Sequence, residues 1–126
     1  MRLAGRLQKL YETYGEDADF WWIYIQEAHP TDGRRPSKRV QIESHKTFDD
    51  RQTAAEGCSK VSVLKVPVLL DDMNDSAATA YSASPERFFI LGADGKVAYA
   101  GERGPFGVDL DALEERLKEL LVKGEY

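Results

Sequence analysis

The sequence predicts one α/β domain over residues 1–126, with helices on both faces of a mixed sheet. Helical and apolar strand patterns alternate up to Tyr81, a β-hairpin signal follows, and an amphipathic helix ends the chain. The order is helix, strand, helix, strand, short helix, hairpin and helix. This is the later part of a thioredoxin-like α/β fold, a three-layer sandwich.

The first half of the chain contains two helical patterns around one apolar strand. A stripe at helical spacing predicts a helix over residues 2–14, which Gly15 ends. Residues 20–25 are apolar on both faces, so we expect a central strand covered by helices on each side. Ser44 is the expected N-cap of a second helix over about residues 46–60.

The second half contains a strand over residues 66–70, a short helix over 74–81, and the hairpin. Strands 87–91 and 96–100 flank the turn Gly-Ala-Asp-Gly. Asp109 is the expected N-cap of the last helix, in which Glu114 and Lys118 form an i,i+4 pair. Its core side carries Leu110, Leu113, Leu117, Leu120 and Leu121.

Composition excludes several classes of function. A net charge of −5 and a pI of about 5.1 leave no extended basic face for nucleic acid. No apolar run reaches the roughly 18 residues of a membrane helix, and the N-terminus lacks a signal-peptide pattern. The one cysteine, Cys58, rules out an internal disulfide and favours a reducing compartment, so we expect a cytoplasmic protein without a membrane partner.

Glu27 and His29 follow the strand at 20–25 and are the first candidate functional residues. Ligands of open α/β sheets bind beyond the carboxyl ends of the strands, and alternate residues of an extended chain share a face. A carboxylate beside an imidazole can fix its tautomer and make it a proton donor. On the pattern alone, a loop or capping role is the commoner one for such a histidine.

Three other polar positions have both a plain and a functional interpretation. His45 stands at the start of the second helix, where the helix dipole favours a neutral imidazole, although capping or solvent contact would also explain it. Cys58 lies late in that helix on its apolar side, which indicates a small buried side chain and not a nucleophile. Asp71 and Asp72 have no third metal ligand at a sensible spacing, so we expect turn chemistry and no metal.

Several runs resemble the iodothyronine deiodinase family: YIQEAHPTDG, SHKTFDDRQTAAE, VPVLLDDMND, PERFFIL and GPFG, between about Leu10 and Leu117. The resemblance implies a thioredoxin fold and reductive removal of iodide with electrons from an external thiol, without a bound cofactor. It places Glu27, His29 and His45 around the active site and a cis peptide at Pro67. Pro67 and Phe106 are the expected substrate-binding residues, although Phe106 would also serve to plug the core.

Proline at the start of the strand 66–70 fits this expectation on physical grounds, because it cannot donate to a sheet ladder and a cis peptide can make the bend. The chain departs from the family at Arg34, where Trp is usual, and at its front. The strand and turn that carry the family's cysteine or selenocysteine precede the helix at 2–14 and are not in this sequence. We therefore expect an N-terminally truncated domain.

Two classes of function stay open at this point. One is a deiodinase-like oxidoreductase acting on an iodothyronine or another halogenated phenol, with the nucleophile encoded just upstream of Met1. The other is a non-catalytic thioredoxin-like binding domain, or a redox protein of the thiol peroxidase type. We expect the missing strand to belong between strands 20–25 and 66–70, so that the sheet rearranges or a second copy fills the gap as a homodimer.

Overall fold

The structure is a computed structural model that describes residues 3–26, 44–62, 64–104 and 106–123. Glu27, His29 and Arg34 lie outside these described residues. The predicted order of elements is confirmed, with strands shorter than expected. The elements are α1 (Leu3–Tyr14), β1 (Trp22–Tyr24), α2 (Phe48–Val61), β2 (Val68–Leu70), α3 (Ser76–Ala80), β3 (Phe89–Leu91), β4 (Val97–Ala100) and α4 (Leu110–Lys123).

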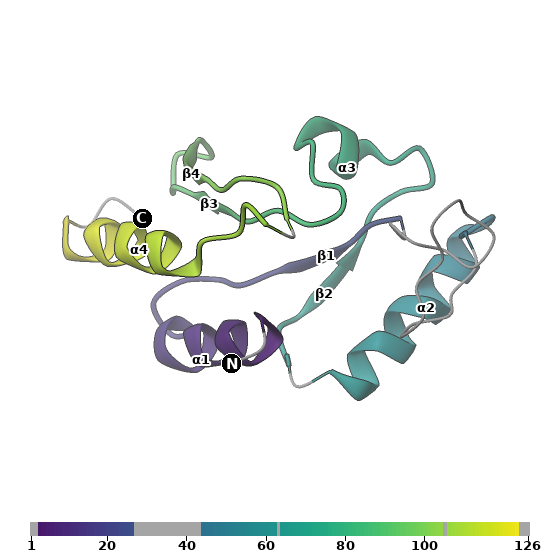
Figure 1. Cartoon of the computed structure of the whole chain (residues 1–126), viewed down its shortest axis with the longest axis horizontal. Coiled ribbons are helices and arrows are strands. Elements are labelled where there is room, and N and C mark those ends of the chain that lie inside the picture. The colour runs from purple at the N-terminus through teal and green to yellow at the C-terminus, as the bar shows by residue number, and fades with distance from the viewer. Residues whose placement is uncertain (1–2, 27–43, 63, 105, 124–126) are drawn as a thin grey trace.

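The strands of the described residues form two separate two-stranded sheets, where one mixed sheet was predicted. β1 and β2 are parallel, with Trp22 opposite Val68 and Tyr24 opposite Leu70. β3 and β4 form the predicted antiparallel hairpin. β1 pairs directly with β2, so no gap lies between them; this is the sheet rearrangement expected as one of the two alternatives, and the place of the upstream strand stays a prediction. In Figure 1, α2 lies on the right side of the molecule, and α1, α4 and the hairpin β3–β4 lie on the left.

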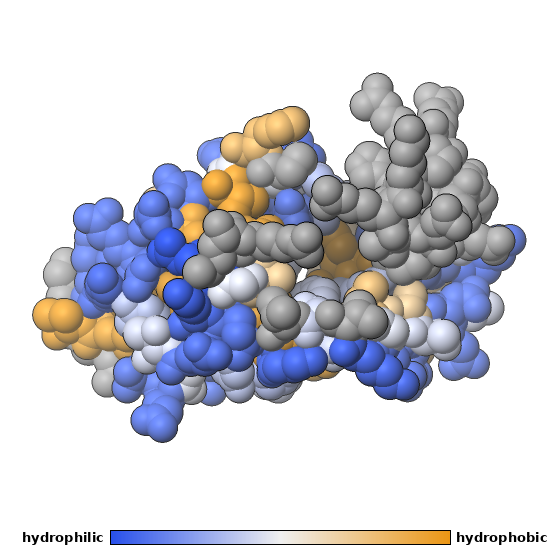
Figure 2. All heavy atoms as spheres, turned by 60° about the horizontal axis from the view of Figure 1, so that its bottom comes forward, coloured by the Kyte–Doolittle hydropathy of each residue, from blue (hydrophilic) through white to orange (hydrophobic). Residues whose placement is uncertain are grey.

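The main core lies where α1 and α4 pack against the hairpin. Leu10 of α1 is 2% exposed, and of the leucines predicted for the core side of α4, Leu110, Leu113 and Leu117 belong to the same cluster and Leu121 packs against it. On the face seen in Figure 2, hydrophilic side chains surround hydrophobic patches at the left end and in the middle. None of the helices in the described residues combines the length and apolar character that a membrane crossing requires. The buried cluster is Leu10, Tyr14, Leu110, Leu113 and Leu117.

A polar clamp joins α1 to α4 beside this core. Glu114 accepts hydrogen bonds from Arg6 Nη2 at 2.8 Å and from the Tyr14 hydroxyl at 2.7 Å. Arg6 also pairs with Asp111 at 2.9 Å. The predicted Glu114–Lys118 pair is present at 3.9 Å. The shorter contacts to α1 show that Glu114 serves mainly to connect two helices.

The pair β1–β2 is covered less completely than predicted. α2 packs against β2, but Ile23 and Leu69, which face each other in the register, are 42% and 46% exposed. Trp21, two residues before Ile23 and on the same side of the strand, is 58% exposed. The expectation of helices on both faces is therefore wrong for this part of the described chain, because α1 and α4 cover the hairpin instead.

Helix α2 begins at Phe48, and its N-cap is Thr47, so the assignment of Ser44 as the cap is wrong. Thr47 Oγ1 accepts from the Asp50 amide at 3.1 Å, and Asp50 Oδ2 accepts from the Thr47 amide at 3.1 Å. This reciprocal pair is a capping box, which satisfies two amides that the first helical turn leaves open. At α4 the predicted cap is confirmed: Asp109 Oδ1 accepts from the Ala112 amide at 3.0 Å.

The prediction of a cis peptide at Pro67 is wrong. Among the described residues the cis peptide bond is Ser84–Pro85, ahead of β3. Pro67 directly precedes β2, and its carbonyl accepts from the Trp22 amide at 2.9 Å. The ladder thus uses the one hydrogen-bonding group that proline has, at a strand start where no donor is needed.

Candidate functional site

A small polar pocket lies beyond the ends of β1 and β2. Its volume is about 90 Å³. Because parallel strands end at the same edge of a sheet, Gln26 after β1 and Met73 after β2 meet there. His45, on the segment before α2, is the predicted site residue that the structure brings to this edge. The lining residues are Gln26, Ser44, His45, Arg51, Met73 and Asp75.

Arg51 holds this pocket together from the first turn of α2. Its side chain is 2% exposed, and its guanidinium donates in four directions. Nε donates to His45 Nδ1 at 3.1 Å, and Nη2 pairs with Asp75 Oδ1 at 3.1 Å. Nη1 donates to the backbone carbonyls of Asp71 and Asp72, at 3.2 and 2.6 Å. A buried cation needs both a counter-charge and satisfied donors, and Arg51 has both.

The turn from β2 to α3 is fixed by its two aspartates. Asp71 is 4% exposed, and its carboxylate accepts from the amides of Ala77 and Ala78 at 2.9 and 3.0 Å. Asp72 accepts from the Ser76 hydroxyl at 2.6 Å and from its amide at 3.0 Å. These bonds lower the pKa of Asp72, the Ser76 hydroxyl contributing most. The predicted turn chemistry of this pair is confirmed.

His45 is held between two neighbours. The Arg51 Nε–H group contacts one ring nitrogen, and the Tyr24 ring lies 5.7 Å from the imidazole centroid at an interplanar angle of 31°. The other ring nitrogen, Nε2, is buried. Since Tyr24 is itself 7% exposed, the imidazole is fixed against the last residue of β1. Residues of α2 and β1 together therefore set the orientation of the imidazole.

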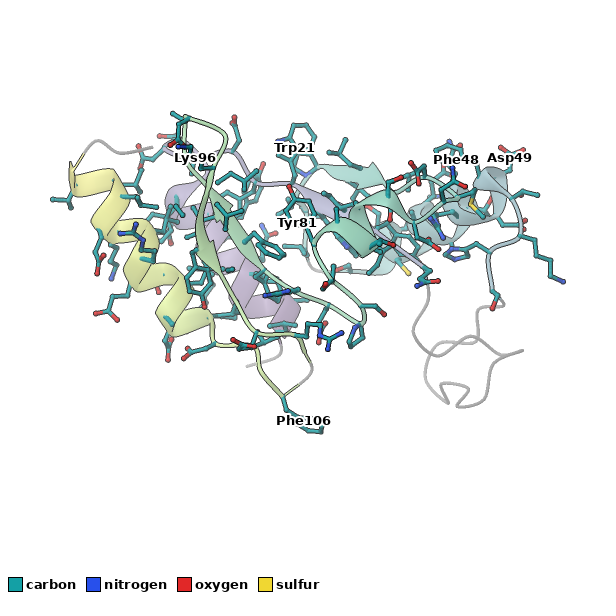
Figure 3. The ribbon with its side chains drawn as sticks, turned by 90° about the horizontal axis from the view of Figure 1, so that it is seen from above. Trp21, Phe48, Asp49, Tyr81, Lys96 and Phe106 are labelled. Carbon is teal, nitrogen blue, oxygen red and sulfur yellow. The ribbon has the colours of Figure 1, made fainter. Side chains whose placement is uncertain are left out.

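The structure does not bring the other described site residues to this pocket. Pro67 lies at the opposite end of β2, because the pocket follows Leu70. Phe106 is 100% exposed and projects away from the body of the chain (Figure 3), so the alternative of a core plug is wrong. Cys58 lies near the C-terminal end of α2, as predicted, partly buried, with Sγ 3.8 Å from the Tyr24 hydroxyl.

Arg51 and Asp75 are pocket residues that the sequence reasoning missed. The apolar side predicted for the second helix contains Cys58, and Arg51 stands seven residues, about two turns, before Cys58 on the same side. A charge inside an apolar helical stripe indicates a buried, partnered side chain. That signal could have identified Arg51.

A larger and more open hollow of about 510 Å³ lies between the N-terminal ends of α1 and α4. Leu3 and Arg6 line it from α1, and Asp111 from α4. Glu86 also lines it and packs against Gly104, where an added Cβ would come within 2.5 Å of the glutamate side chain. The charged groups from α4 and α1 already pair with each other, as described for the clamp.

The fold and pocket define an α/β protein with a histidine-containing polar site at the carboxyl edge of a parallel strand pair. The family model for iodothyronine deiodinase matches residues 1–121. The chain therefore belongs to the iodothyronine deiodinase family, as its sequence runs predicted.

Similar curated proteins carry deiodinase names. The chain is 38% identical to the type I iodothyronine deiodinase of Xenopus laevis over 103 residues, which cover 82% of this chain and 40% of that protein. It is 38% identical to the thyroxine 5-deiodinase of Sparus aurata over 122 residues, covering 94% and 43%. For the thyroxine 5-deiodinase of Ovis aries the identity is 36% over 119 residues, covering 94% and 40%. The chain thus spans about two-fifths of the length of these relatives.

Proposed function

We propose that this chain is the substrate-orienting part of a thiol-dependent reductive deiodinase with a thioredoxin-like fold. The observation that carries the proposal is the family match over residues 1–121, together with a rigidly held histidine at the carboxyl edge of a strand pair. The substrate class is an iodothyronine or another iodinated phenol.

The reaction consumes two thiols for each iodide. The carbon–iodine bond breaks with its electron pair left on carbon, which takes up a proton, and the iodine passes to a chalcogenolate. Two external thiols then reduce the chalcogen–iodine bond and form one disulfide. One aryl iodide and two thiols therefore give one arene, one disulfide, iodide and a proton. No bound cofactor is needed for this balance.

We assign some residues to proton transfer and others to orienting the aromatic ring of the substrate. His45 is the orienting group, a neutral imidazole that hydrogen-bonds a polar substituent of the substrate. Glu27 and His29 are assigned to proton donation to carbon, an assignment that comes from the family resemblance and lies outside the described residues. Pro67 and Phe106 remain proposed substrate contacts.

Cys58 is not assigned as the chalcogen. It lies near the C-terminal end of α2, partly buried beside Tyr24, whereas activated thiols are found at helix N-termini or beside cationic groups. Since it is the one cysteine of the sequence, the reacting sulfur or selenium has to come from outside residues 1–126. The cytoplasmic location, the external thiol reductant and the homodimer belong to the same proposal. Sedimentation tests the homodimer directly.

Iodide release from thyroxine and from a simple iodophenol, with dithiothreitol as reductant, tests the function. We expect no release by the 126-residue chain and release by a chain extended upstream through the expected cysteine or selenocysteine. In the extended chain, Cys58→Ser leaves the rate unchanged and His45→Ala lowers kcat/KM at least tenfold, as expected for loss of a directed hydrogen bond.

Two results would contradict the proposal. One is turnover by the 126-residue chain that depends on Cys58. The other is an upstream reading frame with a stop codon and no such strand. Tight binding of iodophenols without turnover by either chain would instead support the non-catalytic binding domain, and thiol-dependent peroxide consumption would support the peroxidase type.

A further inference from the structure

We propose that Arg51 is a positioning residue that fixes His45 as a neutral imidazole with its proton on Nε2. The contact geometry of residues in α2, β1 and the β2–α3 turn carries this inference. Its consequence for deiodination rests on the proposed function, whereas the state of the imidazole does not.

The direction of one hydrogen bond sets the tautomer. Arginine has donors only and stays protonated, so the 3.1 Å contact between Arg51 Nε and His45 Nδ1 makes Nδ1 the acceptor. The single proton of the neutral ring is then on Nε2. A second proton on Nδ1 would set two N–H groups and two positive charges against each other at this distance, which disfavours the charged ring.

The guanidinium itself cannot turn away, because every side of it is held. Asp75 fixes Nη2, and the carbonyls of Asp71 and Asp72 fix Nη1. Those carbonyls are immobile in turn, since the Asp71 side chain is bound to the amides at the start of α3. Tyr24 lies against the imidazole from β1. The planar fork of arginine therefore defines the direction of the Nε2–H bond, which a lysine ammonium could not do.

The charged and titratable groups facing His45 come from each neighbouring element. Arg51 and Asp50 belong to α2, Asp75 is the N-cap of α3, and Tyr24 belongs to β1. Arg51 is in hydrogen-bond contact with the ring, with Nε 3.1 Å from Nδ1. The other residues of the pocket lining, Gln26, Ser44 and Met73, carry no charge.

NMR of the 126-residue chain tests the inference without any substrate. Long-range nitrogen–proton spectra distinguish the two ring nitrogens, and the His45→Gln variant separates His45 from His29, the other histidine of the chain. We expect His45 at pH 7 to be neutral with the proton on Nε2. In Arg51→Met the pH of imidazole protonation should rise by about one unit or more, because a cation within 4–6 Å is removed.

The matched control is Asp75→Asn, which removes the counter-charge of Arg51 and leaves the Nε–H donor in place. Protonation of His45 should then occur at a lower pH than in the wild type, because the arginine charge is no longer offset. A merely structural role for Arg51 would loosen the pocket in both variants and move both titrations the same way. Opposite shifts therefore support the inference, and parallel shifts or unchanged titrations overturn it.

The spectrum of the wild-type chain tests the tautomer of His45 even if Arg51→Met does not fold. A proton on His45 Nδ1 at pH 7 would overturn the inference. In an active extended chain, Arg51→Met and His45→Ala should lower kcat/KM to a similar extent, with no additional loss in the double variant. Absence of deiodination with the expected NMR result would reject the proposed function and leave the positioning role intact.

Discussion

The contact between Tyr14 and Glu114 shifts the pKa of both side chains, so its contribution to the stability of the fold depends on pH. Burial, with the hydrogen bond and the charge of Glu114, raises the pKa of Tyr14 to about 12. The same hydrogen bond is the main cause of a lowered pKa at Glu114. The raised Tyr14 pKa means that its stabilisation is complete below pH 10 and is lost as the pH rises towards 12. For Glu114 the stabilisation is present above its ordinary pKa and is lost as the pH falls through the lowered value.

Tyr14→Phe should therefore reduce stability at neutral pH by about 1–2 kcal/mol, because the variant loses a hydrogen bond to a charged group. Between pH 10 and 12 the difference from the wild type should shrink, as the wild-type phenol loses its proton beside a carboxylate. Urea unfolding at pH 7, 10 and 12 measures both effects. Tyr11→Phe, in the same helix, is the control. A difference that does not change with pH would contradict the assigned hydrogen bond.

The capping box at the start of α2 leads us to expect different losses of stability on substitution of Thr47 and of Ser44. Thr47→Ala removes the acceptor for the Asp50 amide and should lower the free energy of unfolding by about 1 kcal/mol. The backbone amide of Lys46 is the largest cause of the lowered pKa of Asp50, so the cap should weaken as the pH falls through that value. Thermal melts at pH 7 and pH 3 measure both effects.

Ser44→Ala is the matched control for this cap, since Ser44 was the cap expected from sequence. It should change stability by less than about 0.5 kcal/mol, as is usual for exposed positions. Equal losses in the two variants would mean that the box around Thr47 does not set the start of the helix.

These elements show what local sequence can and cannot specify. The stripe of α4 and the cap at Asp109 are encoded within a few residues, and both were predicted correctly. The cap of α2 was misplaced because Ser44 and Thr47 are both good N-caps, and only the acidic residue three positions after Thr47 distinguishes them. The position of the cis peptide was misassigned for the same reason, since both Pro67 and Pro85 precede apolar strands and the cis bond lies before Pro85.

Pairing and site assembly depend on residues far apart in the chain, so the sequence predicted them less well. β1 and β2 are both short and apolar, and nothing local states that they pair with each other instead of with a third strand. His45 was selected from its position before a helix and from the family resemblance. The partners of Arg51 depend on the β2–α3 turn, which is distant in sequence and lies beside α2, so a charge in the apolar stripe indicates burial of Arg51 but not its contact with His45.

The two parts of the chain differ in how much apolar surface they bury. α1, α4 and the hairpin share one cluster of buried side chains, whereas β1 and β2 pair over three residues and leave Ile23 and Leu69 about two-fifths exposed. Local opening is easiest where few apolar contacts are lost. We expect backbone amides of α4 to exchange with solvent at the rate of global unfolding, and those of the β1–β2 ladder to exchange faster.

Leu117→Ala and Leu69→Ala compare how much the two parts of the chain contribute to stability, as measured by hydrogen exchange and urea unfolding. Leu117 is 6% exposed, so its truncation should cost about 2–5 kcal/mol and accelerate exchange throughout α1 and α4. Leu69 is 46% exposed, and its truncation should cost less than about 1 kcal/mol and affect mainly β1 and β2. If Leu69→Ala instead destabilised α4 as much as Leu117→Ala does, the apolar face of β1 and β2 would be part of a buried core in solution. The division of burial between the two parts of the chain would then be wrong.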